Sequence, residues 1–260
     1  MGSLASKSLS ATYKSLLKVA DETNGVSSSY SKIEDGEGTE SSVSITNNKI
    51  RVQPTSADST AVFDVKNQSG SALLTVDSSN SVVKVGTSQV SATTQLLTFR
   101  GYRLVAGSAG THMFVPCGGA GFSNLAEITG GTGTDPSTSF DKTTTTDETV
   151  HMLFNVPYNM TIDAVKVFAS TDQDTDCTLN YHLMSYDMIA DGTTNDGNLS
   201  NGTVLADGQA TSVDRNVLKS TDLTIQSSSV TSGKVIACFV ENETNTDDIN
   251  LQVQVKYHIA

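Results

Sequence analysis

Four histidines and one run of alternating carboxylates are the side chains of this chain with the clearest capacity for chemistry. The histidines are His112, His151, His182 and His258, and they are widely separated. His112 lies five residues before Cys117, and Cys177 lies five residues before His182. In a β-strand an odd separation sends two side chains to opposite faces, so neither pair has the geometry of half a zinc site. We therefore expect isolated structural histidines and no metal site.

The alternating carboxylates lie in the run 172–176, where Asp172, Asp174 and Asp176 resemble the start of a calcium loop. The sixth position is Cys177 rather than Gly, and the twelfth is Leu183 rather than Glu, so the EF-hand pattern fails. We expect a solvated turn here, with ion binding as the alternative. The sequence contains no recognisable catalytic constellation, and we expect neither enzymatic activity nor a cofactor.

Composition narrows the range of partners. The formal net charge is −12 and the sequence pI is about 4.6. Nucleic-acid binding depends on neutralising phosphates with Lys and Arg, so no nucleic-acid partner is expected. No apolar run approaches the roughly 20 residues that span a bilayer, so no membrane insertion is expected. The three cysteines, Cys117, Cys177 and Cys238, are odd in number and widely spaced, which predicts buried free thiols.

The elements that must position any site are strands, because short alternating patterns dominate the chain. Between residues 43 and 85 each expected strand offers only two apolar side chains on one face. Asn, Ser and Gly residues between the pairs predict turns. The pairs are Val43/Ile45, Ile50/Val52, Phe63/Val65, Leu74/Val76 and Val83/Val85.

A meander with one narrow apolar face needs a second layer to cover it. Nothing nearby in the sequence supplies that layer, so we expect self-association into a homotrimer, with the apolar faces directed at a common axis. The residues expected in the trimer core are Ile50, Val52, Phe63, Val65, Leu74, Val76, Val83 and Val85.

Residues 96–260 carry longer strand patterns, and they predict a β-sandwich of jelly-roll type. Two stretches, 129–146 and 190–202, are rich in Gly, Thr, Asn and Asp and are expected to be loops, serving either recognition or contact with solvent or neighbouring subunits. Strands are expected at 96–105, 112–115, 150–156, 162–169, 177–184, 213–225, 235–240 and 249–259.

The N-terminal segment has a helical pattern. Ser10 could cap a helix over 11–22, and the apolar side chains Leu9, Tyr13, Leu16 and Leu17 would share one face of it. A helix of this length is marginal alone. We expect a short helix or an extended anchor that docks on a partner through these four residues, with a frayed tail as the alternative.

Two parts of the chain resemble a known class of proteins. The run 11–21 (ATYKSLLKVAD), followed by 34–41 (EDGEGTES), resembles N-terminal segments of virion structural proteins from marine tailed phages, including cyanophages. The run 63–77 (FDVKNQSGSALLTVD) looks like the repeat of trimeric phage fibre shafts and tailspike necks. The resemblance implies a homotrimer attached to the capsid or tail through its N-terminal segment, with the C-terminal part directed outward.

The expected organisation is all-β: a thin trimeric β-prism-like shaft, then a jelly-roll-like β-sandwich head. Residues 1–42 would anchor the protein to the virion, 43–95 would form the shaft and connector, and 96–260 would form the head. The resemblance implies a short tail or capsid fibre, made in the host cytoplasm and located in the virion. Its partners would be its own copies, capsid or tail proteins, and a host-surface glycan or protein. The alternatives are a non-viral carbohydrate-binding module or adhesin and, less favoured, a glycan depolymerase.

Overall fold

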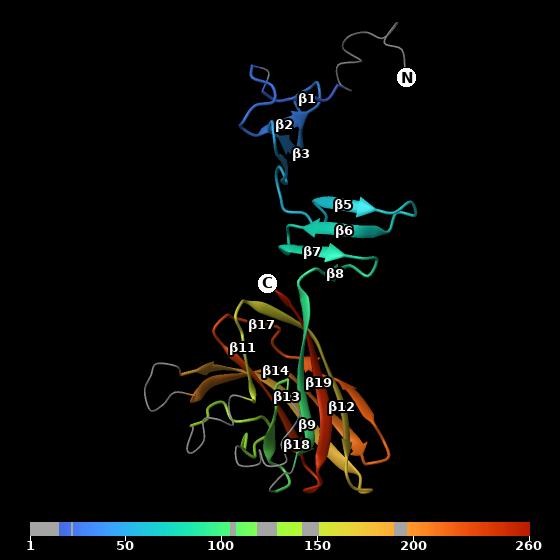
Figure 1. The fold of residues 1–260 in the computed structure, drawn as a ribbon, viewed down its shortest axis with the longest axis vertical. Coiled ribbons are helices and arrows are strands. Elements are labelled where there is room, and N and C mark those ends of the chain that lie inside the picture. Colours follow the sequence, from blue (N-terminus) through green and yellow to red (C-terminus); the bar gives the residue numbers. More distant parts are fainter. Residues whose placement is uncertain (1–15, 22, 105–107, 119–128, 142–150, 190–196) are drawn as a thin grey trace. The chain divides into compact units, whose positions relative to one another are not determined.

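The computed structural model describes residues 16–21, 23–104, 108–118, 129–141, 151–189 and 197–260. The secondary structure of these residues consists of β-strands and contains no helix, which confirms the all-β expectation (Figure 1). In the same ranges, no helix could serve as a membrane-spanning segment. The chain divides into an N-terminal unit, Met1–Ala92, and a C-terminal unit, Thr93–Ala260.

The N-terminal unit contains two separate four-stranded antiparallel meanders, where the sequence suggested one. The short strands have Asx-type turns between them. In one such turn the Asn67 side chain accepts a hydrogen bond from the Ser71 N–H, and Gly70 has φ +86°, a conformation that suits glycine. The first sheet contains β1 (Lys18–Val19), β2 (Ser31–Glu34), β3 (Glu40–Ile45) and β4 (Ile50–Val52), and the second contains β5 (Phe63–Lys66), β6 (Ala72–Asp77), β7 (Val82–Val85) and β8 (Val90–Ser91).

The helix expected over 11–22 is wrong for the described part of that range. Lys18 and Val19 form β1, which pairs with β2, and the Lys18 ammonium lies 3.2 Å from the Glu34 carboxylate. Just after β1, the Asp21 carboxylate accepts hydrogen bonds from backbone N–H groups two and three residues later, which turns the chain. A strand partner thus prevails over a helical pattern too short to be stable alone. The first sheet also runs unbroken across the boundary expected at residue 42.

The C-terminal unit consists of two antiparallel sheets. One has the order β15-β12-β19-β9, with β17 also paired to β12. The other has the order β10-β18-β13-β14-β16, with β11 also paired to β18. The bounds are β9 Thr94–Leu104, β10 His112–Val115, β11 Leu153–Asn155, β12 Met160–Thr171, β13 Cys177–Met188, β14 Leu199–Val213, β15 Lys219–Asp222, β16 Thr224–Ile225, β17 Ser229–Val230, β18 Val235–Asn242 and β19 Ile249–Ile259.

The two sheets pack against each other around one hydrophobic core, in a sandwich-like arrangement. The burial pattern of strand β19 shows why. Val253 and Val255 are fully buried, whereas Gln254 between them is only partly buried. Their partners across the core come from the other sheet and include Leu179, Tyr181 and Val240. Alternation along each strand therefore directs one row of side chains into the shared core.

The outer face of the β10-β18-β13 sheet carries a second core, covered by the segment 129–141. Tyr186 donates a hydrogen bond from its hydroxyl to the Ser137 carbonyl, 2.9 Å away, and Phe140 packs against Phe239. Part of the expected 129–146 loop is thus a packed cover. The second core comprises Phe114, Met152, Met184, Tyr186, Leu199, Val235, Ala237 and Phe239.

Strand β14 departs from expectation. The sequence placed a loop over 190–202 and a strand over 213–225, but β14 is already formed at Leu199 and ends at Val213. Two glycines within it permit close contacts. A Cβ at Gly202 would lie 2.5 Å from the Tyr186 ring, and one at Gly208 would lie 2.8 Å from Leu223. The glycines serve packing here rather than turns.

Candidate self-association face

The second N-terminal sheet gathers apolar side chains on one face. Register places Phe63 opposite Val76 and Val65 opposite Leu74. Strand β7 continues both rows, because Val83 pairs with Val76 and Val85 pairs with Leu74. Directly opposed residues in an antiparallel pair share a face. The structure therefore brings together six of the expected trimer-core residues and adds Val90 of β8. We call this set the apolar face: Phe63, Val65, Leu74, Val76, Val83, Val85 and Val90.

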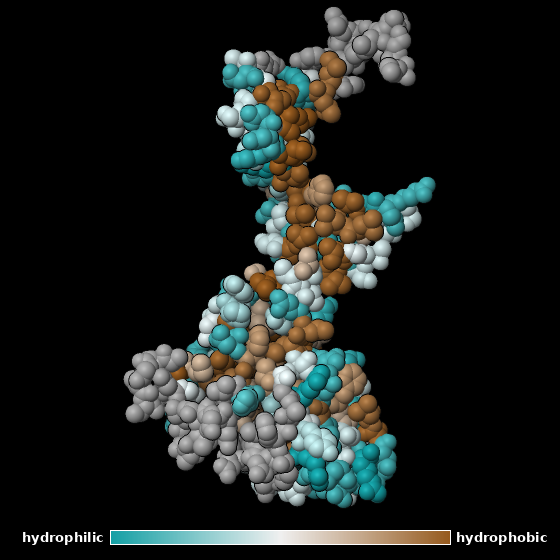
Figure 2. Space-filling model, in the orientation of Figure 1, coloured by the Kyte–Doolittle hydropathy of each residue, from teal (hydrophilic) through white to brown (hydrophobic). Residues whose placement is uncertain are grey.

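The apolar face is substantially open in the single chain. Phe63 is 42 % exposed, and Val65, Val83 and Val85 are 40–42 % exposed. Figure 2 shows hydrophobic residues gathered over the β5–β8 region. A cluster of this kind is typical of a surface that another molecule covers.

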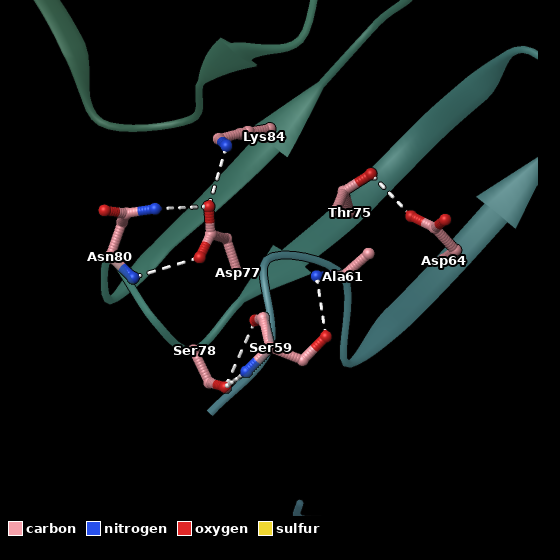
Figure 3. Close-up of polar contacts among 8 residues, drawn as sticks. All are labelled: Ser59, Ala61, Asp64, Thr75, Asp77, Ser78, Asn80 and Lys84. Carbon is pink, nitrogen blue, oxygen red and sulfur yellow. Dashed lines mark hydrogen bonds and ion pairs between the residues drawn. The ribbon is translucent and has the colours of Figure 1, made fainter. Parts of the chain in front are cut away.

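The opposite face of the same sheet is mainly polar, although it also carries Leu73 and Val82, and its central polar residues are buried. Thr75 and Asp77 of β6 are 6 % and 1 % exposed. Thr75 donates a hydrogen bond to the Asp64 carboxylate, at 2.6 Å, and the segment before β5 is bonded to the end of β6 through Ser59 and Ser78 (Figure 3). This sheet thus buries polar side chains inside the chain and leaves its apolar side chains open, the reverse of an ordinary monomeric domain.

The Asp77 carboxylate is the electrostatic centre of the polar face. Lys84 donates to it at 2.7 Å, and Asn80 donates through both its side chain and its backbone (Figure 3). These donors lower the pKa of Asp77 from 3.8 to about 2, and the hydrogen bond from Lys84 has the largest effect. The carboxylate therefore joins β6, the following turn and β7.

Replacing Asp77 by Asn is expected to remove an acid-sensitive contribution to the stability of the β5–β8 sheet. The folded-state pKa is depressed, so this contribution is complete above pH 3.8 and is lost as pH falls towards 2. Amide hydrogen exchange of the sheet between pH 5 and pH 2 measures it. The exposed Asp58→Asn variant is the control, and an acid profile of Asp77→Asn identical to that of the unmodified chain would contradict the prediction.

The other two expected trimer-core residues lie in the first sheet. Ile50 and Val52 of β4 pair with Ile45 and Val43 of β3. Ile50 is 74 % exposed, whereas the polar side chain of Ser44 is buried. The first sheet therefore shares the reversal seen in the second.

The structure describes two of the four expected anchor residues. Leu16 and Leu17 precede β1 and are both exposed. Leu9 and Tyr13 lie outside the described residues. The structure thus leaves the anchor role as a prediction.

The expectation of isolated histidines is wrong for His112 and His182. Their ring centroids lie 4.9 Å apart, edge to face, on the outer face of the β10-β18-β13 sheet. The pKa of His182 is lowered to about 4, mainly by burial of the ring and secondly by the neighbouring His112. No sequence pattern indicates this contact, because the two residues come from strands that are not consecutive in the chain.

Two carboxylates of the run 172–176 have partners within the protein. Asp174 pairs with Arg215 and also accepts a hydrogen bond from Asn216. Asp172 accepts the backbone N–H of Asp248, which fits a turn tied to its neighbours. The three cysteines are free thiols, and burial raises the pKa of Cys117, Cys177 and Cys238.

Comparison with known proteins gives no assignment: no family model matches the chain, and neither does any curated protein. The open apolar face of β5–β8 is therefore the main structural indication of function.

Proposed function

We propose that this chain is a virion structural protein of a tailed bacteriophage, a short homotrimeric fibre on the tail or capsid. The region before β5 attaches it to the particle, and the C-terminal unit is a jelly-roll-like head that binds a host-surface glycan or protein. The observation that carries the proposal is the apolar face of β5–β8, which is open while the polar face behind it is buried.

Burial of the apolar face against identical copies supplies a driving force for assembly. Completing the burial of a side chain that is about 40 % exposed contributes roughly 0.5–1 kcal/mol. The five residues of the apolar face with about this exposure, Phe63, Val65, Val83, Val85 and Val90, therefore contribute roughly 2.5–5 kcal/mol per chain. In a closed ring of copies, the apolar face of every chain is covered by its neighbours. We propose three copies because the run 63–77 resembles the repeat of trimeric fibre shafts.

Trimerisation also suits a receptor-binding role for the head. Three heads on one fibre, and several fibres on one particle, convert weak single contacts into firm attachment. The acidic composition favours a glycan or protein receptor over nucleic acid.

The solution mass of the purified chain and its presence in particles test the proposal together. We expect a mass near three times 27.3 kDa by light scattering at micromolar concentration, and we expect the chain in purified virions by mass spectrometry. A variant lacking residues 1–53 removes the first sheet whole and is expected to keep the trimeric mass while failing to join particles. This cut is preferable to one at residue 42, which would divide β3.

The solution mass and the presence in particles test separate parts of the proposal. A folded 27.3 kDa monomer would overturn the trimer. A trimer that is absent from particles, or a truncated trimer that still joins them, would overturn the virion role or the anchor.

A further inference from the structure

The second core of the C-terminal unit contains a cluster of metal-ligating side chains from three adjacent strands. Register places His112 of β10 opposite Glu241 of β18, and Glu241 opposite Asn180 of β13. His182 lies two residues further along β13, so its side chain lies on the same face. His112, His182 and Glu241 each offer a ligand atom, and these three atoms lie within 4.8 Å of one another.

Both histidines are buried, and each has ring nitrogens without a protein hydrogen bond. The His112 side chain is fully buried and the His182 side chain is 6 % exposed. Neither ring nitrogen of His182 has a partner, and Nδ1 of His112 has none. Buried polar atoms of this kind are rarely left unsatisfied, so three on two touching rings call for a ligand.

Neighbouring groups set the tautomer of His112 and the position of the Glu241 carboxylate. Nε2 of His112 lies 2.8 Å from the Gly133 carbonyl, which can only accept, and 4.0 Å from the Glu241 carboxylate. Nε2 therefore carries the proton, and Nδ1 is the His112 nitrogen that keeps its lone pair. A metal-binding histidine commonly donates its second nitrogen to a backbone carbonyl in this way. Asn180 donates to the Glu241 carboxylate at 2.8 Å and fixes its position.

We propose that His112, His182 and Glu241 bind one divalent cation of the zinc class. Two imidazoles and a carboxylate form a donor set that Zn²⁺ accepts. The Asp135 carboxylate lies at the edge of the cluster, 3.7 Å from Nδ1 of His182, and its side chain is more than half exposed. Small side-chain movements bring the donors to metal-binding distance.

The site would be structural. It lies under the covering segment 129–141, which contributes Gly133 and Asp135, and the cation would join this segment to β10, β13 and β18. The ligands come from three strands separated by about 60 residues or more, so no spacing along a single strand indicates the site.

Metal titration of the full chain, produced without a histidine tag and dialysed against a chelator, tests the proposal. We expect the chain to bind about one equivalent of Zn²⁺ by calorimetry, and to give a Co²⁺ absorption spectrum typical of a low-coordinate site with nitrogen and oxygen ligands. His182→Ala and the isosteric Glu241→Gln are each expected to weaken Zn²⁺ binding at least tenfold.

His258→Ala is the matched control, because His258 is a partly exposed histidine paired with Asp163 and lies outside the cluster. It is expected to leave Zn²⁺ affinity unchanged. Failure of the folded, unmodified chain to bind Zn²⁺ at micromolar concentration would overturn the proposal. Unchanged affinity in Glu241→Gln and His182→Ala, or loss of binding in the His258→Ala control, would also overturn it.

Discussion

Replacing Phe63 by Asp is expected to convert the proposed trimer into monomers or aggregates, with association weakened at least a hundredfold. In the proposed trimer this side chain points at the common axis, where three copies would place three carboxylates together without counter-charges. Removing an unpaired charge from water costs several kcal/mol per ion, which exceeds the contribution of any one side chain on the apolar face. Sedimentation velocity over a concentration series measures the change.

The variant separates association from folding, because Phe63 is 42 % exposed in the single chain and β5 can tolerate a polar residue there. Phe63→Leu keeps an apolar side chain and is expected to retain the trimeric mass. Leu218→Asp adds the same charge at an exposed apolar residue of the C-terminal unit and is also expected to leave the mass unchanged. An intact trimer of Phe63→Asp would show that the apolar face does not lie at the axis.

The second large effect is expected from Phe239→Ala, which should lower the free energy of unfolding of the C-terminal unit by about 3–5 kcal/mol. Phe239 is fully buried, and its ring centroid lies 4.3 Å from that of Phe114 and 5.9 Å from that of Phe140. The covering segment approaches it so closely that a Cβ at Gly130 would lie 2.7 Å from the ring. Loss of the ring therefore leaves a cavity between the sheet and its cover.

Urea unfolding of the full chain, followed by a signal from the C-terminal unit, measures the loss. Tyr102→Ala removes an aromatic ring that is 65 % exposed, and it is expected to change stability by less than about 0.5 kcal/mol. If Phe239→Ala and Tyr102→Ala proved equally mild, the second core would not be a stabilising element.

The strands that sequence reasoning located well are those whose two faces have sharply different environments. In β19, Val253 and Val255 alternate with polar residues, and both bounds agree with expectation. Strand β10 was also located correctly. The thin strands β5, β6 and β7 were found from only two apolar residues each, because turn residues bracket them. Burial on one face and turn chemistry at the ends are local signals that a single sequence carries.

The features that could not be predicted from the sequence, such as β14, β1 and the contact between two histidines, depend on contacts between distant segments. Strand β14 contains Asn-Gly and Asp-Gly pairs that normally indicate turns, and only the closeness of Tyr186 and Leu223 explains its glycines. Similarly, Lys18 and Val19 fit a helical pattern until β2 is available as a partner. The contact between His112 and His182 depends on the order β10-β18-β13, which no spacing along the chain encodes.

The pairing of β9 with β19 has a consequence for synthesis on the ribosome. Thr94 is the partner of His258, so the C-terminal unit cannot close until β19 has emerged, on the order of ten seconds after β9. The β5–β8 sheet pairs only within residues 63–91 and can form while that interval runs. If the chain forms the proposed trimer, neighbouring ribosomes on one messenger RNA would then hold several copies of this sheet with their apolar faces uncovered, and association would begin before synthesis of the C-terminal unit is complete.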